Sequence, residues 1–289
     1  IGLTNDLIAD LTYHTDFAQV EADQEVVNLT RFSLFFPEKR QFFTESVGIF
    51  DFGKAGTSSG GDASANDPGL LALYYSRRIG LVDGQQVPII GGGRVTGKIG
   101  DYTIGVLNIT TEEETLASRQ LDNANFTVAR VKRNVLANSS IRAIVVYSQG
   151  GISEYNRAIG VDAGFMLGQY VTLTGAVGKT FSPGSDGAGT TAGIADFAWK
   201  SDRFHYGGQY QDVGEAFNAE MGYIPRLDIR STKLRAGWTP RPQRGGIRQL
   251  LFNTEAEYYE NHAGRVESRM QAVSANMQRQ DTSGAFASV

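Results

Sequence analysis

The most constraining feature of this chain is a two-residue alternation of apolar side chains with small or polar ones. In AIGVDAGFML, residues 158–167, Ile159, Val161 and Ala163 alternate with Ala158, Gly160 and Asp162. Successive side chains of a β-strand point to opposite faces, whereas a helix repeats every 3.6 residues. The stretch is therefore predicted to be a strand with one apolar face.

The same alternation recurs along most of the chain after residue 90. It is clear at 171–177, 195–200, 204–210, 233–238 and 249–258, and again near the start at 10–17. Glycine supplies 35 of the 289 residues, well above its typical share of about 7%. Because glycine weakens helices and is tolerated at bends and turns, an all-β antiparallel fold is indicated.

The connections between the predicted strands alternate in length. Short turns are expected at 100–101, 168–169 and 201–202, with a slightly longer one at 137–140, and longer polar loops at 110–125, 182–189 and 213–227. Outer-membrane barrels have short periplasmic turns and longer external loops, and strands of about 9–13 residues can cross a bilayer at a tilt. Near the strand ends lie Tyr170, Trp199, Trp238 and Tyr258, where interfacial aromatic girdles are found.

A soluble antiparallel sandwich or barrel shares this alternation but points its apolar face inward. The other face carries Lys200, Arg235, Glu255 and Glu257, which suits a wet lumen and a solvated exterior equally. Soluble strands average about 5–6 residues, shorter than the strands expected here. Strand length and loop asymmetry therefore favour transmembrane β-strands over the soluble fold.

Composition excludes several classes of protein. There is no cysteine, so disulfide scaffolds and thiolate metal sites are excluded, and the net charge of −4 without a basic stripe argues against a nucleic-acid partner. No apolar run is long enough for a transmembrane helix. Because His14, His205 and His262 are scattered and no nucleophile motif is visible, we predict no metal, no cofactor and no enzyme activity.

Residues 19–90 depart from the strand pattern. FFPEKRQFF, at 35–43, places adjacent charges between aromatic pairs, and LALYYSRRIG, at 71–80, follows a low-complexity stretch. Such a segment is too charged for a lipid-facing strand and too aromatic for a plain loop. We interpret 1–289 as one barrel region, in which 19–90 is an irregular lumen segment and loop and 91–289 is a regular strand meander.

Four stretches resemble the DUF5916 family: DFAQVEADQEVVNLTRFSLFFPEKRQFFTESVGIFDFG at 16–53, YYSRRIG at 74–80, PIIGGGRVTGKIGDYTIGVLN at 88–108 and FTVARVKRNVLANSSI at 126–141. The resemblance implies a secreted protein of Bacteroidota and related bacteria, in which an outer-membrane barrel follows a domain similar to family 9 carbohydrate-binding modules. It further implies a Gram-negative outer membrane, contact with its lipid, and assembly by the barrel assembly machinery. Because the family's function is largely unassigned, the resemblance supplies a location and an architecture rather than a reaction or a ligand.

Two departures from the family pattern are visible. The carbohydrate-binding-like domain is absent, and the chain ends in AFASV without the terminal aromatic usual for bacterial barrels. We count about twelve strands along the alternating pattern, and a complete barrel of this family is expected to have more. We therefore expect both ends to be cut and the barrel to be incomplete.

The candidate site is a charged cluster in the lumen segment, formed by Glu38, Lys39, Arg40, Glu45, Arg77 and Arg78. Charges held away from water need partners, and arginine binds a carboxylate at two points. Our first interpretation is an ion cluster on the lumen wall, in which the carboxylates pair with the arginines and other lumen charges. Contact with a substrate is the second interpretation. The third is catalysis on a glycosidic bond by Glu38 and Glu45, which no partner motif supports.

The leading functional hypothesis is a non-enzymatic envelope protein that binds or passes glycans or other nutrients. The glycan ligand is taken by analogy from the family's neighbouring domain. The alternatives are a cell-surface hydrolase acting on polysaccharide or peptide, and a structural envelope barrel without transport activity.

Overall fold

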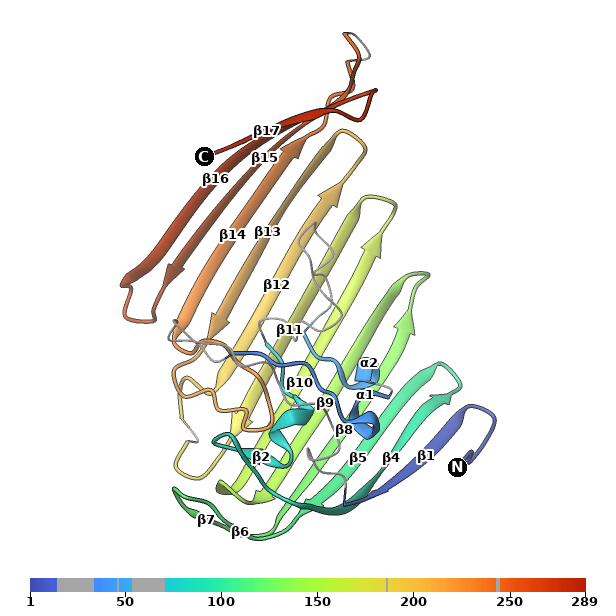
Figure 1. Cartoon of the computed structure of the whole chain (residues 1–289), viewed down its shortest axis with the longest axis vertical. Coiled ribbons are helices and arrows are strands. Elements are labelled where there is room, and N and C mark those ends of the chain that lie inside the picture. The colour runs from blue at the N-terminus through green and yellow to red at the C-terminus, as the bar shows by residue number, and fades with distance from the viewer. Residues whose placement is uncertain (15–33, 46, 54–70, 186, 243–244) are drawn as a thin grey trace.

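The computed structural model describes residues 1–14, 34–45, 47–53, 71–185, 187–242 and 245–289. Within them, thirteen strands form one antiparallel sheet, in which each strand pairs with the sheet strand that precedes and follows it in the chain (Figure 1). The all-β antiparallel prediction is confirmed, and the sheet has one strand more than the dozen we counted. The strands are β1 (Leu7–Tyr13), β4 (Ile89–Ile99), β5 (Tyr102–Thr111), β8 (Ala124–Val135), β9 (Ser139–Gly150), β10 (Ser153–Leu167), β11 (Val171–Phe181), β12 (Thr191–Lys200), β13 (Phe204–Val213), β14 (Ile229–Trp238), β15 (Ile247–Glu260), β16 (Val266–Arg279) and β17 (Gly284–Ser288).

The two ends of the sheet differ in their connections. At one end, here called the short-turn end, lie the turns 100–101, 136–138, 168–170 and 201–203. The opposite, long-loop end carries 182–190, 214–228 and 112–123, the last of which contains the hairpin of β6 (Glu114–Thr115) and β7 (Gln120–Leu121). Two connections break the rule: 239–246 at the short-turn end is long, and 151–152 at the long-loop end is short.

The two faces of the sheet are sorted by polarity, as β10 shows most clearly. Ile159 and Val161 are 45% and 49% exposed, whereas Ala158 and Asp162 on the opposite side are each only 1% exposed. We call the face that carries the buried residues the inner face and the opposite one the outer face. On β10 the apolar side chains thus point outward and the small or polar ones inward, the reverse of a soluble barrel. The inner face of β5, β8 and β9 also carries buried apolar residues, such as Leu107, that pack against the segments covering it.

The outer apolar band has the dimensions of a lipid-facing surface. From Ile159 to Leu167 the outward residues of β10 cover about 26 Å of strand at roughly 3.3 Å per residue. At a strand tilt of about 40° this is ~20 Å of depth, close to the ~25 Å band of outer-membrane barrels.

Aromatic rings gather on this outer face near the short-turn end. Trp199 stacks on Tyr206 at 4.8 Å between ring centroids, and Tyr170 lies 6.0 Å from Trp199. Trp238 stacks with Phe204 and with Phe252 in the neighbouring strands. Tyr258 lies close to the opposite end of β15. The rings that the sequence suggested as girdles therefore lie near strand ends.

Between β1 and β4, the described residues 34–45, 47–53 and 71–88 pack on the inner face. Figure 1 shows their short helices and turns lying across the N-terminal half of the sheet. Glycines make room for them: a Cβ at Gly160 would lie 2.5 Å from the Phe52 ring, and one at Gly105 would lie 2.7 Å from Ile49. Glycine inside a strand commonly marks such a close approach. The short elements of this part are α1 (Gln41–Thr44), α2 (Val47–Phe50), the 3-10 turn η2 (Ser76–Arg78), β2 (Leu81–Val82) and β3 (Gln85–Gln86).

The sheet of the described residues is open. β1 pairs only with β4, and β17 pairs only with β16. In the described residues, the two edge strands therefore do not pair with each other. In the same described residues, no helix is both long and apolar enough to span a membrane.

Candidate functional site

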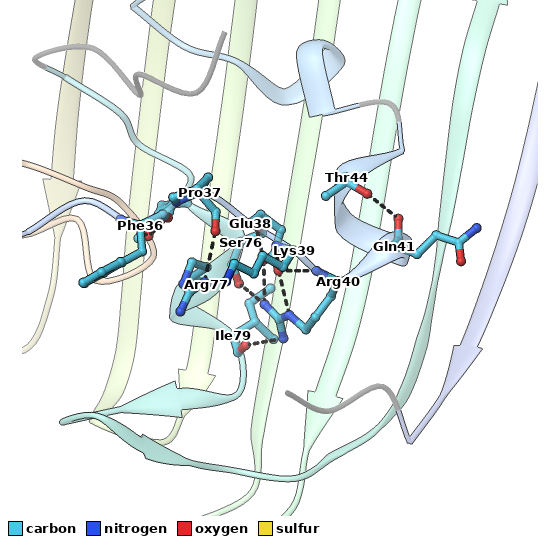
Figure 2. Close-up of polar contacts among 11 residues, drawn as sticks. Phe36, Pro37, Glu38, Lys39, Arg40, Gln41, Thr44, Ser76, Arg77 and Ile79 are labelled. Atoms are coloured by element: carbon cyan, nitrogen blue, oxygen red, sulfur yellow. Dashed lines mark hydrogen bonds and ion pairs between the residues drawn. The ribbon is translucent and has the colours of Figure 1, made fainter. Parts of the chain in front are cut away.

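The predicted charged cluster is built around one buried ion pair (Figure 2). Arg40 Nη2 lies 2.8 Å from Glu38 Oε2, and the two side chains are 1% and 6% exposed. Glu38 Oε1 also accepts hydrogen bonds from Arg40 Nε and from the backbone N–H groups of Lys39 and Arg40, at 2.9 to 3.0 Å. The carboxylate thus closes a tight turn and neutralises the guanidinium within its own stretch.

The same guanidinium ties the two conspicuous sequence motifs together. Arg40 Nη1 donates to the carbonyl of Ile79 at 2.8 Å, and Nη2 donates to that of Ser76 at 2.9 Å. The Ser76 hydroxyl donates to Glu38 Oε2 at 2.6 Å, and the Phe43 ring centroid lies 4.1 Å from Arg40 Cζ. Figure 2 shows this bridge between the stretch 36–44 and the turn at 76–79. Because a buried charge is costly unless paired, these contacts account for charges set among aromatic rings.

The electrostatics keep Glu38 ionised. Burial alone would raise its pKa, but the hydrogen bond and charge of Arg40 and the hydroxyl of Ser76 outweigh burial and hold the pKa below its ordinary value. The pair therefore remains charged throughout the physiological pH range.

The other two predicted arginines donate to backbone carbonyls. Arg77 Nη1 donates to Pro37 at 3.0 Å, and Arg78 Nε donates to Gly222 at 3.2 Å. Both bonds join segments distant in sequence. A ligand role for the cluster is untested by these contacts and stays a prediction.

Glu45 belongs to a second ion pair that the sequence did not single out. Arg94 of β4 is 3% exposed, and its Nη2 lies 2.6 Å from Asp10 of β1 and 3.3 Å from Glu45. Its Nη1 donates to the carbonyl of Phe42 at 2.5 Å. Glu38 and Glu45 are therefore bound to different arginines. The only signal for Arg94 was a single charge in the glycine-rich strand IIGGGRVTG.

The loop 214–228 between β13 and β14 also packs against the inner face; we call it the inward-folded loop. Asn156 Nδ2 in β10 donates to the carbonyl of Asn218 at 2.8 Å, and Thr180 of β11 accepts from the backbone N–H of Asn218 at 3.0 Å. The backbone N–H of Tyr75 donates to the Met221 carbonyl at 2.6 Å. Sheet, inward-folded loop and lumen segment therefore share one core.

Further ion pairs follow the polar side of the alternation along the inner face. Asp162 is fully buried between Arg130 and Arg142, at 2.6 and 2.7 Å. Arg235 Nη2 binds Asp196 at 2.8 Å. Their period-two positions could have identified them, although the pairing across strands could not be read from the sequence.

The C-terminal strands hold a more hydrated group. Lys233 Nζ lies 2.6 Å from Glu255 and 2.5 Å from Glu257, with the three side chains 29%, 33% and 17% exposed. Two carboxylates share one ammonium here, and all three groups keep contact with solvent.

The C-terminal end of the inward-folded loop is held by His262, whose contacts with two carboxylates we call the histidine clamp. The His262 ring nitrogens lie 2.8 Å from Asp228 Oδ1 and 2.9 Å from Asp212 Oδ1. Partial burial works to lower the pKa of His262, but the two carboxylates outweigh it and raise the pKa above the ordinary value. Across the part of the chain that the structure describes, no three His, Asp or Glu side chains are grouped so as to hold a metal ion.

Comparisons with known proteins give one match along nearly the whole chain. The model of the family "Domain of unknown function (DUF5916)" matches residues 1–285. No curated protein matches the chain.

Several solved structures have a partly similar shape. OccK8 (OprE) of Pseudomonas aeruginosa is 15% identical with a TM-score of 0.38, over 72% of this chain and 69% of that one. A BenF-like porin from Pseudomonas fluorescens Pf-5 is 14% identical with a TM-score of 0.36, over 68% of this chain and 60% of the porin. OccK9 (OpdG) of Pseudomonas aeruginosa is 14% identical with a TM-score of 0.35, over 68% of this chain and 59% of that one. Because these scores are low, we base the function below on this chain's own geometry.

Proposed function

This chain belongs to the DUF5916 family of domains of unknown function, and we propose that it is part of an outer-membrane β-barrel through which small polar molecules pass. The observation that carries the proposal is the sorting of the two faces. Ile159, Val161 and Val177 are half exposed on the outer face, while Asp162 and Asp196 point inward. A surface of this kind suits lipid outside and polar groups inside.

The inner face offers a route for a solute along its C-terminal strands. The buried residues of the described chain come from β4 to β14 and from the segments packed on them, and none lies on β15 or β16. The described parts of the lumen segment and the inward-folded loop thus cover the N-terminal half of the inner face. The hydrated ion pairs of Lys233 lie on the other half.

Glycans and other nutrients are the solutes that we propose, following the association implied by the family resemblance. An outer-membrane location in a Gram-negative cell, contact with outer-membrane lipid and insertion by the barrel assembly machinery are parts of the same proposal. Glu38 and Glu45 serve in it as structural partners of Arg40 and Arg94 rather than as catalytic groups.

The first test is cell fractionation of the full-length protein, followed by gel migration with and without boiling. We expect the protein in the outer-membrane fraction, with a shift on boiling because a closed barrel resists detergent until heated. Conductance in planar bilayers should then follow. A soluble protein without a shift would overturn the barrel, whereas a membrane barrel without conductance would favour the purely structural alternative.

A further inference from the structure

A cavity of about 460 Å³ lies on the inner face near the short-turn end, away from the Glu38–Arg40 cluster. Its size falls within the range of roughly 300–1,000 Å³ typical of small-molecule sites. It is lined by strands β11 to β16. The inward-facing lining residues are Thr172, Ala198, Lys200, His205, Gly207, Arg235, Asn253, Glu255, Ala272 and Ser274.

Strand register sets the shape of this cavity. Ala198 pairs with Gly207, and Lys200 pairs with His205 in the next inward row. The first row gives a floor of small side chains, and the second gives a polar rim. The cavity is therefore a consequence of small residues at matched positions on adjacent strands.

The imidazole of His205 occupies space that is free because Gly237, on the neighbouring strand, has no side chain. A Cβ at Gly237 would lie 2.0 Å from His205 Cε1 and 2.8 Å from Asn253 Oδ1. The ring therefore lies across the Gly237 backbone, next to the Asn253 amide. Any side chain at Gly237 would displace this pair.

The acidic side chain that lines the cavity is already engaged, because Glu255 binds Lys233 at 2.6 Å. Arg235 is bound from outside the lining by Asp196, at 2.8 Å. In contrast, Lys200 makes no side-chain hydrogen bond or ion pair with any described residue, and the buried Arg235 Nε–H has no acceptor among them. The charged groups of the lining that keep unused hydrogen bonds are therefore cationic.

We propose that this cavity binds a small hydroxylated organic carboxylate, such as a hexuronic acid, with Lys200 and Arg235 facing the carboxylate. Charge-assisted hydrogen bonds are the stronger kind. Asn253 and Ser274 can bond to hydroxyl groups, because an amide and a hydroxyl both donate and accept. Glu255 in the same cavity opposes a doubly charged anion such as a phosphate ester. This proposal rests on the proposed function and narrows the class of solute to hydroxylated carboxylates.

The experiment uses three sugars of the same ring that differ in charge: glucuronate, glucose and glucosamine. Binding to the full-length protein in detergent is measured by calorimetry, and passage into liposomes is measured by swelling. We expect glucuronate to bind roughly tenfold more tightly than glucose, the effect of one charged hydrogen bond, and glucosamine to bind most weakly.

Lys200→Gln should reduce the preference for glucuronate several-fold and leave glucose binding unchanged. The matched control is Lys179→Gln, because Lys179 lies on the outer face of the neighbouring strand β11, against the Phe181 ring. Gly237→Ala should weaken all three sugars, because its methyl group would displace Asn253 together with His205. If Lys200→Gln lost the boiling shift, Asn253→Ala would serve as the second probe, with loss of glucose and glucuronate binding expected.

The outcomes separate this site from the channel. Equal binding of the three sugars, or an unchanged preference in Lys200→Gln, would overturn the site even if all three sugars entered liposomes. Selective, Lys200-dependent binding without passage would support the site and reject the channel.

Discussion

The inner face has a covered half, the N-terminal strands on which the lumen segment and the inward-folded loop pack, and an uncovered half, the C-terminal strands. Inward-facing charged residues have different environments in the two halves. In the covered half, Arg40 and Asp162 are almost completely buried, and their partners include backbone carbonyls and other buried charges. In the uncovered half, Lys233 and its two glutamates keep contact with water. Ion pairs of the first kind fix the lumen segment, whereas those of the second line a wet surface. The difference arises both from what packs on the sheet and from the strands themselves, because the inner face of β5 and β9 carries buried apolar residues such as Leu107 and Ile144.

The largest effect should come from breaking the covered half. Arg40→Ala leaves Glu38 buried without its partner, and we expect a loss of about 3–5 kcal/mol in unfolding free energy, measured by urea titration in detergent. Arg119→Ala is the control, because Arg119 and Asp83 form a half-exposed pair expected to contribute about 0–1 kcal/mol. Equal losses would show that the Arg40 pair is not sealed from water.

The outer face should not distinguish the two halves. Val161→Arg in the covered half and Leu234→Arg in the uncovered half both introduce a charge among exposed apolar side chains. Each should cost roughly 2–4 kcal/mol if the position lies near the bilayer midplane, measured as folding yield and stability in lipid vesicles. A loss for only one of them would mean that lipid surrounds only part of the sheet.

A smaller difference in stability is expected between glycine replacements on the packed inner face and on the outer face. Gly160→Ala drives a methyl group to 2.5 Å from the Phe52 ring, and overpacking of this kind costs about 1–3 kcal/mol. Gly193→Ala is the matched control on the outer face, where the nearest atom would lie 3.5 Å away. Near-equal stabilities of the two variants in thermal unfolding would contradict the close contact of Phe52 with β10.

Removing the shared cation of the uncovered half should matter less. Lys233→Gln leaves Glu255 and Glu257 side by side, but both are partly hydrated, so a loss of no more than about 1 kcal/mol is expected. The loss should shrink further in high salt, because solvent ions screen exposed charges. A loss as large as that of Arg40→Ala would show that this half is also dry.

The smallest effect concerns pH and the clamp at His262. Its pKa is raised in the folded protein, so its contribution to stability is complete below the unfolded value of about 6.5 and is lost as pH rises through the higher folded value. Unfolding midpoints should therefore fall modestly from pH 6 upward, and His262→Gln should abolish this slope. The Glu38–Arg40 pair should add nothing to the slope, because the Glu38 pKa is lowered. A slope that survives in His262→Gln would assign it to another group.

The local sequence pattern predicted the strands of the sheet well, but it predicted poorly which side chains would bind each other. The alternation in residues 158–167 indicated both the strand and its apolar face, because successive residues of a strand point to opposite faces of the sheet. Asn156, by contrast, looks like any polar strand residue, and its partner Asn218 lies 62 positions away. The ion pairs of Arg94 and Lys233 could not be predicted from the sequence either. Only the register of β1 with β4 and of β14 with β15 brings the partner carboxylates within reach. The cluster at 38–45 was visible because its charges are adjacent in the chain, although its bond to Ser76 was not.

The pairing of β1 with β4 has a mechanical consequence for the lumen segment. Tyr13, at the end of β1, stands opposite Gly91, near the start of β4, so the chain leaves and re-enters the sheet across a gap of about 4.8 Å. The segment between them is thus anchored at both ends to one pair of neighbouring strands at the long-loop end. Any force on that segment therefore acts first on β1 and β4.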